Sequence, residues 1–83
     1  MEFQKHVKVR QEKFGAVVFE TLREKIFVTN ESGAQILSLL QAGKEPEAVT
    51  NELSSMYDGD PAVIKKDVDE VISTLQESGI IKN

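Results

Sequence analysis

The sequence predicts an α+β domain in which a three-stranded antiparallel sheet is followed by three helices. All four phenylalanines and several short runs of valine and isoleucine lie in residues 1–30. Short apolar segments in this region have the length and composition of strands, whereas from Asn30 onward apolar residues recur at helical spacing. At 83 residues, the chain has the length of one small domain.

Three strands are expected, over residues 5–10, 14–20 and 24–29. His6 to Arg10 alternates with a period of two, which is typical of a half-buried strand. Phe14 to Phe19 is apolar on both faces, which suits the central strand. Lys25 to Thr29 supplies the third strand. The links between these segments are short, so we expect antiparallel neighbours in a meander that leaves open sheet edges.

Three helices are expected, over residues 31–42, 46–57 and 61–78. Asn30 or Ser32 can cap the first helix. Pro46 fits the first turn of the second helix, where its missing N–H is no loss. Asp60 followed by Pro61 is a strong start signal for the third helix.

Apolar residues at helical spacing mark the face of each helix that is expected to reach the core. These residues are Gly33, Ile36, Leu37 and Leu40 in the first helix, Val49, Leu53 and Met56 in the second, and Ile64, Val68, Val71, Ile72 and Leu75 in the third. A short apolar tail, Ile80 and Ile81, is expected to pack back onto the sheet or core.

Charge and composition exclude several classes of protein. Ten basic and fourteen acidic residues give a net charge of −4, which argues against a nucleic-acid or anionic-membrane partner. The absence of cysteine excludes a disulfide scaffold and a thiolate site. No apolar stretch approaches the roughly 18 residues of a membrane span, and no signal peptide is visible. The expected location is the cytoplasm.

No group of residues has the spacing of a catalytic, cofactor or metal site, so neither enzyme activity nor a cofactor is expected. His6 is the only histidine. It has no obvious carboxylate or hydroxyl partner at strand spacing and is expected to be an ordinary surface or half-buried side chain. Ser54 and Ser55 lack a base that could activate them. The acidic residues between 58 and 70 lack the spacing of an EF-hand.

Two other protein classes agree less well with the predicted order of strands and helices. Three strands with three helices also form winged helix-turn-helix DNA-binding regulators, in which the third helix would enter the major groove. Lys65 and Lys66 could then meet phosphates, but carboxylates on the same helix would be repelled by them. Acidic carrier proteins are helical bundles with a modifiable serine after aspartate, and this chain has no Asp-Ser pair.

The run from Asn30 to Leu40, NESGAQILSLL, resembles the start of the first helix in PqqD-like domains. Other segments agree with that family in order and spacing, namely Val9-Arg10, Phe14 to Phe19, Gly43, Pro46-Glu47, Leu53, Tyr57-Asp58, Asp67-Val68 and Leu75 to Ile81. The resemblance extends from about Val7 to Ile81. It implies a recognition element, or peptide chaperone, that binds the leader of a ribosomally synthesised, post-translationally modified peptide (RiPP). It further implies delivery of that leader to a modifying enzyme such as a radical-SAM enzyme, a cyclase or a leader protease.

The resemblance also implies a binding site, because leaders in this family add as a strand beside the third strand, next to the third helix. Carried over to this chain, the peptide-binding residues are Arg23, Lys25, Ile26, Phe27, Val28, Thr29, Ile64, Lys65, Val68 and Ile72. An edge strand suits this role because its backbone N–H and C=O groups are unpaired. The three basic residues could meet acidic leader residues.

Two features of this implied site remain open in the sequence. Lys25 and Phe27 share one face of the third strand and Ile26 and Val28 the other, so either pair could face the core. The apolar residues of the third helix are also expected core residues.

The chain resembles a stand-alone adaptor, and its open sheet edge would also allow a homodimer.

Overall fold

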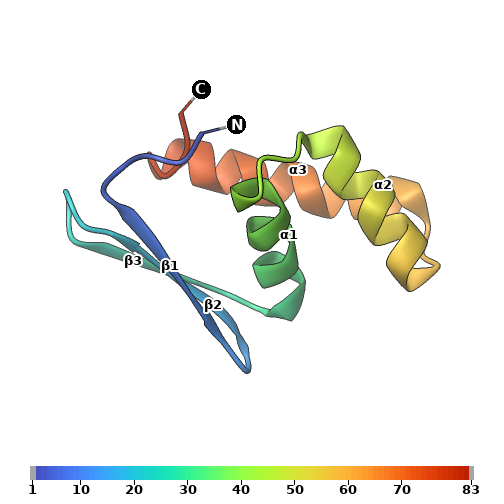
Figure 1. The fold of residues 1–83 in the computed structure, drawn as a ribbon, viewed down its shortest axis with the longest axis horizontal. Coiled ribbons are helices and arrows are strands. Elements are labelled where there is room, and N and C mark those ends of the chain that lie inside the picture. The colour runs from blue at the N-terminus through green and yellow to red at the C-terminus, as the bar shows by residue number, and fades with distance from the viewer. Residues whose placement is uncertain (1, 83) are drawn as a thin grey trace.

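The computed structural model describes residues 2–82 as one sheet with three helices to one side of it (Figure 1). Its elements in chain order are β1 (Val7–Glu12), β2 (Gly15–Glu20), β3 (Lys25–Thr29), α1 (Glu31–Gln41), α2 (Pro46–Tyr57) and α3 (Pro61–Glu77). The strands pair antiparallel in the order β1-β2-β3. This arrangement confirms the fold class predicted from the change in apolar spacing at Asn30.

The first strand lies two residues later than the expected span of 5–10. Lys5 and His6 form a turn, and Gln11 and Glu12 continue the strand by pairing with β2. Polar side chains hid this extension, because strand pairing uses backbone groups and needs no apolar residue. Phe14 belongs to the hairpin turn, where 55% of it is exposed, and not to β2.

Gly15, the first residue of β2, lies against the end of β3. Its φ angle is 153°, and a Cβ atom added to it would lie 2.0 Å from the backbone oxygen of Thr29. Only a residue without a side chain fits this contact. Gly15 therefore allows β2 to approach the point at which β3 passes into α1.

The core lies between the helices and the inner face of the sheet. Buried residues from every layer form it, namely Ala16, Val18, Ala34, Ile36, Leu37, Leu40, Val49, Leu53, Val68, Ile72, Leu75, Ile80 and Ile81. Met56 was expected here, but 60% of it is exposed. The prediction was wrong: in the last turn of α2 it is the neighbouring Tyr57 that contacts α1, through Gln35.

Side-chain caps fix where two of the helices begin. The Asn30 side chain accepts a hydrogen bond from the Gly33 N–H at 2.9 Å. The Asp60 side chain accepts one from the Ala62 N–H at 2.9 Å, and Pro61 follows it. Because these bonds satisfy N–H groups that have no partner within the helix, they stabilise each start.

The two ends of the chain lie side by side (Figure 1). Phe3 and Ile81 form an isolated antiparallel bridge, and the Gln4 N–H donates to the Ile80 oxygen at 2.9 Å. Ile80 and Ile81 are buried, as expected for the apolar tail. These contacts secure the C-terminal end of α3 beside the sheet.

Candidate functional site

The outer edge of β3 has no partner strand within the part of the chain that the structure describes. Two hydrogen bonds of β2 determine which β3 residues face this edge. The Thr21 N–H, just after β2, donates to the His6 oxygen on the β1 side, whereas the Ala16 N–H points to the β3 side and donates to Thr29 Oγ1. Hydrogen-bonding directions alternate along a strand, so Ala16, Val18 and Glu20 face β3.

The partners of these three residues on β3 are Thr29, Phe27 and Lys25 respectively. By the same alternation, the backbone groups of the two residues between them, Ile26 and Val28, point to the free edge. A row of backbone N–H and C=O groups at an edge is a template for an added strand. The free edge of β3 thus offers hydrogen bonds to an extended peptide.

The side chains of β3 divide between the two faces of the sheet. Phe27 pairs with the fully buried Val18 and packs against the core, so Lys25 and Phe27 face the helices. Ile26 and Val28 face the other way and are 67% and 58% exposed. The register with β2 therefore settles a point that the sequence left open.

One flank of α3 continues from the core towards the start of α1. Ile64 and Asp67 line a cavity together with the first turn of α1, and Val71 lies on the same flank at helical spacing. Ile64 and Val71 are half-buried, whereas Val68 is fully buried and Ile72 is 8% exposed. Val68 and Ile72 are therefore mainly core residues.

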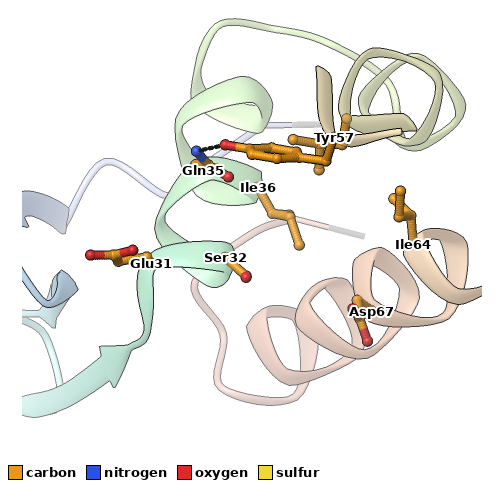
Figure 2. A pocket seen from close by; sticks show the side chains of 8 residues that line it. Glu31, Ser32, Gln35, Ile36, Tyr57, Ile64 and Asp67 are labelled. Atoms are coloured by element: carbon orange, nitrogen blue, oxygen red, sulfur yellow. Dashed lines mark hydrogen bonds between the residues drawn. The ribbon is translucent and has the colours of Figure 1, made fainter. Parts of the chain in front are cut away.

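The cavity between α1, α2 and α3 measures about 280 Å³. It is lined by Glu31, Ser32, Gln35, Ile36, Leu53, Tyr57, Ile64 and Asp67. Figure 2 shows Gln35 donating a hydrogen bond from Nε2 to the Tyr57 hydroxyl across its upper side. Glu31 lies at the side of α1 nearest the sheet, and Asp67 lies on α3 opposite.

Two of the basic residues predicted at the site have other partners. Nζ of Lys65 lies 2.8 Å from Oδ2 of Asp69, and this hydrogen bond and the Asp69 charge raise the pKa of Lys65. The Lys65 side chain borders two shallow hollows. One is lined by the first turns of α2 and α3, and the other by the outer surface of α3. Lys65 therefore lies on a different flank of α3 from Ile64 and Asp67. The role of Lys65 in peptide binding stays a prediction, and the structure places its side chain beside Asp69 and the first turn of α2.

Arg23 lies in the turn between β2 and β3 and contacts two other parts of the chain. Its backbone N–H donates to the Glu20 carboxylate at 3.1 Å, and its Nε lies 3.6 Å from the same group. A Cβ atom added to Gly79 would lie 2.2 Å from an Arg23 Nη atom. Arg23 therefore connects the β2–β3 turn with the end of α3.

His6 has a carboxylate partner that its neighbours in sequence did not reveal. Its Nε2 lies 2.9 Å from Oε1 of Glu20, a residue that is 1% exposed. The expectation of a histidine without a partner was wrong, because strand pairing brings the two residues together across the sheet. This pair is structural, since it lies at the end of the sheet away from the α1–α3 cavity.

Reasoning from the sequence missed four residues near the site, namely Glu31, Tyr57, Asp67 and Val71. The recurrence of residues 64, 67 and 71 at i, i+3 and i+7 is a signal that could have identified the flank of α3. Within residues 2–82, no three histidine or acidic side chains gather in a group that could hold a metal ion. No helix in the same range is long and apolar enough to cross a membrane.

Three solved structures share this fold. TbiB1 in complex with the TbiA(beta) leader peptide has a TM-score of 0.91 and 20% identity, over 100% of this chain and 96% of that one. Lasso peptide synthetase B1 complexed with the leader peptide has a TM-score of 0.87 and 22% identity, over 99% and 96%. The PqqD truncation of Methylobacterium extorquens PqqCD, described as a stand-alone RiPP recognition element, has a TM-score of 0.79 and 18% identity, over 99% and 87%.

The open-edged sheet followed by three helices is thus the fold of RiPP recognition elements. The family model described as "Coenzyme PQQ synthesis protein D (PqqD)" matches residues 15–81. The chain belongs to the PqqD family. No curated protein sequence matches it.

Proposed function

We propose that this domain binds the leader segment of a ribosomally synthesised precursor peptide and presents it to a modifying enzyme. The leader adds as a fourth strand to the free edge of β3, with the exposed flank of α3 beside it. The observation that carries this proposal is the unpaired edge formed by the backbones of Ile26 and Val28. Backbone hydrogen bonds attach the peptide, and side-chain contacts select it.

Membership of the PqqD family supports this function. Two similar structures were also determined with leader peptides bound, and this chain covers nearly the whole length of both. Their identities of 20% and 22% establish a shared fold. The assignment of a leader peptide to this chain therefore depends on the free edge together with the family.

The residues of the proposed site contribute in three ways. Ile26 and Val28 supply outward backbone groups, while Lys25 and Phe27 face the peptide from the helix side of the strand. Ile64 and Val71 offer half-buried apolar surface on α3. Thr29, Val68 and Ile72 hold these groups in place, and Arg23 fixes the turn before β3. Lys65 takes no part.

The second proposed partner is the enzyme that modifies the precursor, such as a radical-SAM enzyme, a cyclase or a leader protease. The domain itself performs no turnover and contributes by ordering the leader and raising its local concentration near the enzyme. The winged-helix DNA-binding alternative is disfavoured by charge. Lys65 is paired with Asp69, and exposed Asp67 and Glu70 on the same helix would repel phosphates.

An NMR titration tests the leader-binding function. The ¹⁵N-labelled domain is titrated with synthetic leaders of the precursor peptides encoded beside its gene. Saturable shifts of the amides in Lys25–Thr29 and on the Ile64–Val71 flank are expected. Saturable shifts confined to the β1 edge or to α2 would overturn the proposed site, and the absence of shifts with every neighbouring leader would overturn the function.

A further inference from the structure

The cavity between the three helices begins where β3 ends. Thr29 is the last residue of β3, and Glu31 and Ser32, which start α1, line the cavity. Its other wall carries Ile64 and Asp67, on the flank of α3 proposed to lie beside the bound strand. A peptide paired with β3 would therefore pass the mouth of this cavity as it leaves the strand.

The size of the cavity suits one side chain. Its volume of about 280 Å³ is below the usual range for small-molecule sites, which is roughly 300–1,000 Å³. Ile36, Leu53 and Ile64 supply an apolar wall. A guest with a long aliphatic stem would bury that stem against these three residues.

The polar lining is rich in hydrogen-bond acceptors and contains no basic residue. Glu31 and Asp67 contribute carboxylates, and neither forms an ion pair within residues 2–82. Gln35 uses its amide nitrogen to bond Tyr57, which leaves its carbonyl oxygen as a further acceptor. A guest that donates several hydrogen bonds and carries positive charge is complementary to this lining.

Helix dipoles do not reverse this preference. The first turns of α1 and α3 each contribute about half a positive charge and the C-terminus of α2, at Tyr57, about half a negative charge. All three termini border the cavity, so the helix dipoles sum to about half a positive charge, which is smaller than the charge of two carboxylates. The two full negative charges of Glu31 and Asp67 then determine the electrostatic potential.

We propose that this cavity takes an arginine or lysine side chain of the bound peptide; this inference rests on the proposed function. The aliphatic stem packs on Ile36 and Ile64, and the cationic head lies at the rim of the cavity, with Asp67 on α3 and Glu31 on the sheet side of α1 (Figure 2). An anionic side chain would be repelled by these two exposed carboxylates, and a purely apolar one would gain no charge interaction with them. The cavity therefore makes the domain selective for a cation at one position of the peptide.

The other end of β3 carries the opposite charge. Lys25 is exposed, faces the helix side of the sheet and forms no ion pair among the described residues. β3 ends at Thr29, four positions after Lys25, and Glu31 lies beyond it in α1. Because paired strands advance equally per residue, the preferred peptide has an acidic residue at least about four positions from its cationic one.

Selection from a displayed library of random peptides tests this pattern. The native domain should enrich peptides that carry arginine or lysine at one position and aspartate or glutamate at least about four positions away. The double variant Glu31→Gln/Asp67→Asn should lose the cationic preference by about tenfold or more while keeping the acidic one. A control, Glu70→Gln, removes an exposed charge on another flank of α3 and should select the same peptides as the native domain.

The possible outcomes distinguish the role of the cavity from the proposed leader binding at β3. Amide shifts along Lys25–Thr29 locate each enriched peptide at β3. Peptides that bind there without a cationic preference, or with one that the double variant retains, would overturn the cavity's role and leave strand addition standing. If no enriched peptide shifted β3, both proposals would fail.

Discussion

Nε2 of His6 lies 2.9 Å from Oε1 of Glu20, whose side chain is 1% exposed. The same carboxylate accepts hydrogen bonds from the backbone N–H groups of Leu22 and Arg23. Glu20 thereby joins the turn before β1 to the turn between β2 and β3. The start of the edge strand proposed to bind peptide is held by one buried acidic residue.

Replacing Glu20 with alanine should destabilise the domain. The change leaves the N–H groups of Leu22 and Arg23 without their acceptor and removes the partner of His6. We expect the free energy of unfolding to fall by about 2–4 kcal/mol. Urea denaturation measures the fall, and Glu70→Ala, on the exposed face of α3, should change it by no more than about 0.5 kcal/mol. Equal effects of the two substitutions would show that Glu20 does not organise the turn.

The order of the elements could be predicted from local features of the chain. Period-two alternation ended near Asn30, whose side chain caps α1, and Asp60-Pro61 marked the start of α3. Each of these signals acts through neighbouring residues, so the sequence displays it directly. The end of β1 was expected two residues too early, because the backbone pairing of Gln11 and Glu12 leaves no apolar pattern in the sequence.

The candidate site was harder to predict because its residues depend on long-range packing. Which face of β3 is buried follows from the pairing of Phe27 with Val18, and β2 is apolar on both faces. The side of α3 that Lys65 occupies follows from the position of α2. The contact between His6 and Glu20 requires the register of two strands. None of these relationships can be read from residue spacing within a single element.

Replacing Gly15 with alanine should be far more harmful than the same change at Gly43. A Cβ on Gly15 would lie 2.0 Å from the Thr29 oxygen, whereas a Cβ on Gly43 meets nothing within 4 Å. Both residues have positive φ angles, 153° and 92°, so backbone strain is common to the pair. We expect a loss of more than about 3 kcal/mol for Gly15→Ala and about 1 kcal/mol for Gly43→Ala, measured by thermal or urea unfolding. Similar losses for the two variants would mean that the backbone around Gly15 and Thr29 can move apart at little cost in free energy.

The two flanks of α3 should differ in their importance for peptide binding. Val71→Ser removes half-buried apolar surface on the proposed peptide side, and we expect leader affinity to fall about tenfold. Lys65→Ser removes a larger side chain and its ion pair with Asp69 from the other flank, and affinity should stay within about twofold. Isothermal titration with the same leader measures both variants after circular dichroism confirms their folds. A larger loss for Lys65→Ser would restore that residue to the binding surface.

The direct test of strand addition is Val28→Pro. Proline removes the N–H that Val28 directs to the free edge and leaves the bonds between β2 and β3 intact. One backbone hydrogen bond to the leader is lost, and the leader's carbonyl oxygen is left without a donor. Affinity should therefore fall by about tenfold or more. Val28→Thr is the matched control, because threonine keeps the N–H and the branched shape and should bind within about twofold.

The exposed position of Val28 makes this comparison informative about mechanism. Its side chain is 58% exposed and faces away from the helices, so neither variant disturbs the core. If Val28→Pro folds and binds the leader as tightly as Val28→Thr, the peptide does not pair with this edge. If the proline variant alone loses affinity, the backbone of β3 is the attachment point, because the two variants differ in the donor that strand addition requires.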